Sequence, residues 1–103
     1  MNRTKRAILV LGGATPSSEV LERAASYGEV FVLARAVPVP GSRLVVDVDA
    51  AEAGAGRRLR EVTTHLKRRG SRSTGVIGAA DRRAASQDAR ALFPGAAELL
   101  EAA

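Results

Sequence analysis

The chain of 103 residues has the length of one small domain, and we expect residues 1–103 to fold around a single core. It has no cysteine, which excludes disulfide bonds, thiol catalysis and thiolate metal sites, and only 3% of its residues are aromatic, which argues against recognition of bases by stacking. The formal net charge is +5, and no apolar run is long enough for a secretory signal or a membrane span. These features predict a cytoplasmic protein without a membrane partner.

An apolar strand, a helix and a second strand are predicted in the first part of the chain. Residues 7–11 are apolar at every position, as in a strand that is buried on both faces of a sheet. Residues 16–18, a proline and two serines, begin a helix that we expect to end at Gly28. Residues 29–37 form the second strand. A strand, helix and strand in this order predict a right-handed crossover.

Further strands and helices alternate in the second part of the chain. Residues 43–49 alternate between apolar and acidic side chains, which predicts an edge strand or an extended arm. A long helix is expected over residues 50–69, a strand over 72–78 and a helix over 82–92. Residues 96–103 form either a last strand or a terminal helix, and their Ala, Glu and Leu content favours the helix.

This alternation predicts an α/β fold, a three-layer sandwich around a mostly parallel sheet of four or five strands. The strands around Ile8, Val32 and Ile77 are the most apolar, so we expect them to lie at the centre of the sheet. A shortened sheet exposes an edge, and a symmetric pair is the commonest way to cover it. We therefore expect a homodimer, formed through the strand at residues 44–48 or through Leu99 and Leu100.

Three short motifs carry a resemblance to a known family. They are Thr15-Pro16-Ser17-Ser18-Glu19, Val37-Pro38-Val39-Pro40 and Gly78-Ala79-Ala80-Asp81. In their order and spacing, residues 6–100 resemble the first two thirds of a universal stress protein domain. The resemblance implies a Rossmann-like fold, a stress-response or signalling role, and an adenine-nucleotide site made from the turn after the first strand, the exit from the second strand and a later phosphate loop.

The sequence departs from the family pattern at two places. Gly13 stands where nucleotide-binding members carry an acidic residue, and no glycine-rich phosphate loop or final strand follows before Ala103. We therefore expect a short, degenerate member of the family that has no cofactor and in which binding of ATP or another adenine nucleotide is weak or lost. Its function would be that of a non-catalytic module that senses a small ligand or assembles into oligomers.

Ligand-binding candidates lie where the predicted strands end, because parallel sheets bind ligands at that edge. They are Gly12, Gly13, Ala14, Thr15, Ser17, Val37, Gly78 and Asp81, with Pro16 and Ala36 between them. A dinucleotide site is the weaker alternative, since no glycine lies between Gly13 and Gly28 to admit a pyrophosphate, although Arg35 stands where a phosphate contact could lie.

Residues that could support catalysis or metal binding are few. His65 is the only histidine, and no base lies near any serine in the sequence. Asp47 and Asp49 could share a divalent cation, but solvent-facing acids that protect an edge and cap the next helix are the favoured interpretation. We predict that the protein is not an enzyme and has no metal site.

Residues 57–72 contain seven basic residues against Glu61 alone, and this charge of 7 − 1 = +6 exceeds the net charge of +5 of the whole chain. A solvated helix face is the favoured interpretation of this cluster. The alternative function is a basic interaction module that binds nucleic acid or an acidic protein. Its candidate residues are Arg57, Arg58, Lys67, Arg68, Arg69 and Arg72.

Overall fold

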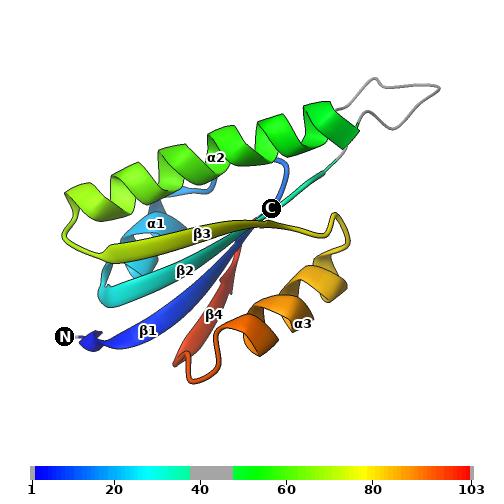
Figure 1. Ribbon diagram of the computed structural model, residues 1–103. Helices are drawn as coiled ribbons and strands as arrows, with labels where there is room; N and C mark the ends of the chain where they lie inside the picture. The colour runs from blue at the N-terminus through cyan, green and yellow to red at the C-terminus, as the bar shows by residue number, and fades with distance from the viewer. Residues whose placement is uncertain (1, 38–47, 103) are drawn as a thin grey trace.

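Four parallel strands and three helices make up the part of the chain that the structure, a computed structural model, describes: residues 2–37 and 48–102 (Figure 1). The strands are β1 (Asn2–Leu11), β2 (Tyr27–Arg35), β3 (Arg72–Gly78) and β4 (Glu98–Glu101). The helices are α1 (Ser18–Ala25), α2 (Val48–Arg68) and α3 (Arg82–Leu92). The strand order is β3-β2-β1-β4 and each pairing is parallel, which confirms the predicted α/β fold.

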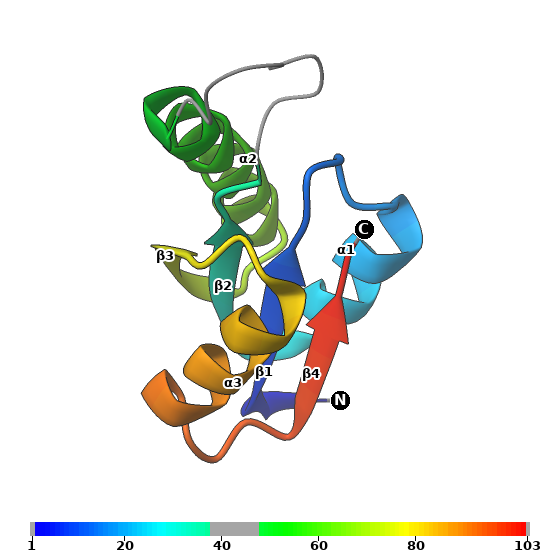
Figure 2. The ribbon, with the colours of Figure 1, turned by 90° about the vertical axis from the view of Figure 1, so that its right-hand side faces the viewer.

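The helices cover both faces of the sheet. In Figures 1 and 2, α1 and α2 lie on one face and α3 lies on the other. Leu9 and Leu11 pack in the cluster beneath α1 and α2, while Ile8 and Val10 pack against α3. All of residues 7–11 are at most 1% exposed. The unbroken apolar run therefore belongs to a strand buried on both faces, as predicted.

β3 lies at an edge of the sheet, so the expectation that the strand of Ile77 is central is wrong. After α3 the chain crosses to the far side of β1, and β4 takes the place beside β1. Ser73 and Thr74 are polar residues that suit an edge, and the side chain of Ile77 remains 46% exposed. The strands of Ile8 and Val32 do occupy the two inner positions.

Residues 98–101 form a strand, so the helix favoured by their composition is wrong. Leu99 pairs with Ile8 of β1 and packs on the α3 side, whereas Leu100 pairs with Leu9 and packs on the α1 and α2 side. A strand turns neighbouring leucines to opposite faces, which lets both layers of the core use them. Burial and pairing outweigh the weak intrinsic preference of these residues for a helix.

Several boundaries also differ from the predictions: β1 begins at Asn2 and not at residue 7, and β2 spans Tyr27–Arg35 and not residues 29–37. Val48 and Asp49 lie in α2, so the predicted extended segment is wrong at these two residues, and its earlier part, 43–47, lies outside the described residues. α1 ends at Ala25 with Ser26 as its cap, and Gly28 is already part of β2. The hydroxyl of Ser26 closes the helix by donating to the carbonyl of Arg23 at 2.6 Å.

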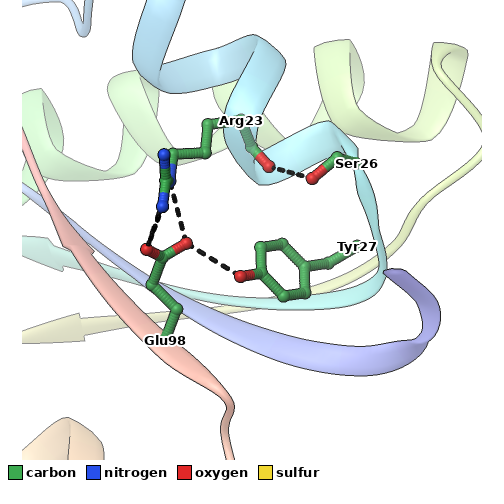
Figure 3. A network of polar contacts seen from close by, with 4 residues as sticks. All are labelled: Arg23, Ser26, Tyr27 and Glu98. Carbon is green, nitrogen blue, oxygen red and sulfur yellow. Dashed lines mark hydrogen bonds and ion pairs between the residues drawn. The ribbon is translucent and has the colours of Figure 1, made fainter. Parts of the chain in front are cut away.

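A carboxylate at the start of β4 joins this strand to α1 and β2 (Figure 3). Nε of Arg23 lies 2.9 Å from Oε1 of Glu98, and a terminal guanidinium nitrogen lies 2.6 Å from Oε2. The hydroxyl of Tyr27 donates to the same Oε1 at 2.8 Å. The hydrogen bonds from Arg23 and Tyr27 lower the pKa of Glu98 below its usual value of 4.5.

A second carboxylate holds the other end of β4. Glu101 accepts hydrogen bonds from Nε of Arg82 at 2.7 Å and from the hydroxyl of Ser86 at 2.9 Å, and these contacts lower its pKa. Glu98 and Glu101 point to opposite faces of the sheet. The short strand β4 is therefore attached by ion pairs to α1 on one side and to α3 on the other.

Replacing Glu98 with Gln should lower the melting temperature at neutral pH, because Arg23 and Tyr27 lose a charged acceptor. The pKa of Glu98 is lower in the folded state, so its contribution is present above pH 4.5 and is lost as the pH falls through the folded value. Thermal unfolding followed by circular dichroism should show the wild type and Glu98→Gln converging in acid. Glu61→Gln, an exposed substitution on α2, is the control; a constant gap at every pH would contradict the prediction.

Candidate functional site

The ends of β1, β2 and β3 bring the predicted ligand-binding segments to one edge of the sheet. Because the strands are parallel, their carboxyl ends share this edge, where sheets of this kind bind ligands. A Cβ built on Gly13 would lie 3.4 Å from Cγ1 of Val37, so the turn after β1 contacts the segment after β2. The N–H of Ala36 donates to the carbonyl of Gly78 at 3.2 Å and ties that segment to the end of β3. We call this region the carboxyl edge.

The turn between β1 and α1 offers mostly main chain. Gly12 and Pro16 are buried, whereas residues 13–15 are exposed. The hydroxyl of Ser17 accepts a hydrogen bond from the N–H of Val20 at 3.3 Å and serves as the N-cap of α1. Unlike Ser17, Thr15 does not cap α1. Its exposed hydroxyl is therefore a polar group of this turn that a ligand could contact.

Gly78 and Asp81 have structural roles at the end of β3. A Cβ at Gly78 would lie 2.6 Å from Cδ2 of Leu33, which is itself buried in the core, so only glycine fits there without a shift. The carboxylate of Asp81 accepts from the N–H of Ala84 at 2.8 Å and caps α3. Core packing therefore explains the glycine at position 78 and helix capping explains Asp81, and neither role requires a ligand.

Two arginines at the carboxyl edge were not among the ligand-binding candidates. A terminal nitrogen of Arg35 donates to the carbonyl of Ala80 at 2.9 Å, and one of Arg58 donates to the carbonyl of Arg35 at 3.2 Å. The Nε of each arginine is buried and has no hydrogen-bond partner among the described residues. Arg35 ends β2 directly after a run of five apolar residues, 30–34, and this signal could have identified it. That Arg58 reaches inward cannot be predicted from its basic neighbours in the sequence.

The basic cluster of residues 57–72 is divided in space. Arg58 turns toward the carboxyl edge, and Arg69 forms an ion pair with Glu22 of α1. Arg57 is exposed at the middle of α2 and Arg68 at its end, roughly 16 Å apart along the helix axis. The predicted residues therefore do not form one continuous patch.

An open groove of about 690 Å³ lies between α2 and β3 and includes part of the cluster. Its lining residues are Leu59, Arg60, Thr63, Thr64, Lys67, Gly70, Ser71, Arg72, Ser73 and Gly75. Lys67 and Arg72 belong to the predicted cluster. The groove lies along the outer side of β3, at a distance from the turn after β1.

The described residues contain neither a cluster of metal ligands nor a helix that could span a membrane. Within residues 2–37 and 48–102, no three His, Asp or Glu side chains gather as they would around a metal ion. Asp47 lies outside the described residues, and nothing is described of the side chain of Asp49. None of the described helices has the length and apolar character needed to cross a membrane.

Comparison with known proteins gives one informative result. No family model matches the chain, and no curated protein matches its sequence. Among solved structures, the chain is similar to the crystal structure of a protein from the universal stress protein family from Burkholderia pseudomallei, with a TM-score of 0.65 and 18% identity over 100% of this chain and 84% of that one. The resemblance inferred from the three motifs is thereby confirmed at the level of the fold.

Substituting Gly78 with Ala should destabilise the protein by about 1–3 kcal/mol, because the added methyl group would force Leu33 out of a well-packed position. Gly13→Ala is the matched control, since its added Cβ would meet Val37 at an ordinary contact distance of 3.4 Å. Urea unfolding of both variants measures the difference. Equal stabilities would mean that the tight packing of Gly78 against Leu33 has no energetic consequence.

Proposed function

We propose that this protein is a non-catalytic stress-response or signalling module that binds a small anionic ligand at the carboxyl edge, with weak or no affinity for ATP. The observation that carries the proposal is the pair Arg35 and Arg58, whose buried Nε–H groups lack partners among the described residues. A buried donor without an acceptor costs about 1–3 kcal/mol, and an anion that accepted from either Nε–H would remove that cost.

The position of the two arginines supports a small ligand. They approach the end of β2 from opposite sides: Arg58 reaches from α2, and Arg35 extends toward the turn at Ala80. The exposed turn at residues 13–15 adjoins the same edge through the contact between Gly13 and Val37. Main-chain groups and guanidinium groups are suited to recognising phosphate or carboxylate oxygens.

Weak affinity for ATP follows from what the same edge lacks. Gly13 has no side chain that could hold a metal ion or a ribose, at the position where the family resemblance places an acid. The side chains of Ser17 and Asp81 already accept hydrogen bonds from main-chain N–H groups of α1 and α3. Recognition would therefore depend on negative charge, with little contribution from adenine or ribose.

Absence of catalysis is part of the proposal. His65 lies on α2, and the groove beside it is lined by Arg60, Glu61, Thr64 and Arg68, away from the carboxyl edge. At the carboxyl end of β4 the hydroxyl of Ser86 donates to Glu101, but this carboxylate is ion-paired with Arg82, which lowers its pKa and makes it a weak base. We further propose a cytoplasmic location and a homodimer.

A thermal-shift screen tests the ligand site. We expect inorganic phosphate and tripolyphosphate to raise the melting temperature, and ATP with Mg²⁺ to raise it no more than tripolyphosphate does, because the adenosine part adds no contacts. Arg58→Gln should abolish the response, whereas Arg57→Gln, which removes the same charge from an exposed neighbouring position, should retain it. Saturable micromolar binding of ATP by calorimetry would contradict weak ATP affinity, and equal loss in both variants would contradict the site.

Dimerisation through the C-terminal strand is tested by light scattering and hydrogen exchange. β4 is an edge strand, and the described residues place no strand beside its outer side. At concentrations where light scattering gives the mass of a dimer, amides of residues 98–102 should exchange more slowly than in dilute protein, while those of β3 should not change. A monomer at every concentration, or protection confined to other residues, would refute this interface.

A further inference from the structure

The outer side of β3 presents main-chain groups that no described strand pairs. Gly78 pairs with Arg35 of β2 and its carbonyl accepts from Ala36, so the main chain of Gly78 faces β2. Successive residues of a strand direct their N–H and C=O groups to alternate sides. The N–H and C=O groups of Ser73, Gly75 and Ile77 therefore point outward, as in a strand that can accept a further neighbour.

The groove between α2 and β3 runs along this free side of the strand. Gly75 forms part of the groove and is exposed, and a Cβ there would lie 2.6 Å from Cδ1 of Leu59 on α2. The missing side chain lets α2 approach the strand closely and leaves the main chain uncovered. Ile77 adds an apolar side chain that is 46% exposed in the same outward row. Main-chain pairing and apolar contact are thus both available to an extended segment.

The charge of the groove selects the kind of segment that would bind. Arg60, Lys67 and Arg72 line it, and its lining residues include no acidic side chain. A second copy of the chain would bring the same three positive charges against these, because two copies that pair through one edge face each other with like residues. Basic residues on an edge oppose such self-pairing, and the same residues attract an acidic strand.

We propose that an acidic, extended segment of a partner protein adds to the sheet beside β3. Its main chain pairs with the outward groups of Ser73, Gly75 and Ile77, and its carboxylates lie against the basic side chains of the groove. A nucleic acid could meet the charge but not the alternating N–H and C=O groups, and the groove offers no aromatic side chain for base stacking. This docking surface is separate from the carboxyl edge and does not depend on the ligand proposed there.

Fluorescence anisotropy with labelled peptides tests the proposal. The probe is a peptide of alternating valine and glutamate. The first comparison peptide carries N-methyl groups on alternate residues, which removes one row of main-chain donors and keeps the charge. The second replaces glutamate with glutamine. We expect the probe to bind the wild type and each comparison peptide to bind at least about fivefold more weakly, since strand pairing and charge both contribute.

Two pairs of variants locate the binding. Ile77→Pro removes an outward N–H while leaving the pairing with β2 intact, and should weaken the probe about fivefold relative to Ile77→Val, which keeps that donor. Lys67→Glu combined with Arg72→Glu should weaken it about tenfold. Arg83→Glu, an exposed charge reversal on α3, is the matched control and should have no such effect. Thermal unfolding confirms that each variant is folded.

Four outcomes would overturn the proposal. The N-methylated peptide could bind as tightly as the probe, which would leave charge alone as the cause. Oligothymidylate could bind more tightly than the probe with the same variant dependence, which would assign the groove to nucleic acid. A homodimer that Ile77→Pro dissociates would assign the edge to a second copy. Equal affinity of every variant, or no binding of the probe by the wild type, would remove the site.

Discussion

The burial of β1 is the constraint on which the rest of the molecule depends. Residues 7–11 are covered on both faces and paired on both sides, with β2 on one edge and β4 on the other. An apolar strand of this kind needs helices above and below it, so α1, α2 and α3 must divide between the two faces. Because all four strands are parallel, their carboxyl ends lie at one edge of the sheet, where Arg58 contacts the main chain of Arg35.

Much of the fold could be predicted from local signals. β3 and α3 have the predicted bounds. Gly70, which has a positive φ, follows the end of α2 and precedes β3, and the side chain of Asp81 caps α3. The failures concern choices that a local pattern does not decide. Leu99 and Leu100 suit a helix by composition, and only the free side of β1 makes them a strand. Likewise, the sequence of β3 does not show that it lies at an edge, because this depends on the later crossover that places β4 on the far side of β1.

The candidate site was predictable in position but not in chemistry. Parallel strands imply that the turn at Gly13, the exit at Val37 and the turn at Gly78 converge, and they do. The roles of individual side chains depend on tertiary distances: Asp81 is close enough to Ala84 to cap it, and Gly78 is needed because Leu33 fills the space above it. Arg58 looked like a member of a solvent-facing basic cluster, because its reach to the carbonyl of Arg35 depends on how α2 crosses the sheet.

The pairing of Ala7 with Glu98 has a consequence for how the protein is made. During synthesis on the ribosome, β1 is available long before β4, so one side of the most apolar strand stays open while nearly all of the remaining described chain emerges. Contacts between residues so distant in sequence form slowly, because a long loop must close first. An open, apolar strand edge in that interval is the kind of surface that chaperones bind and that aggregates recruit.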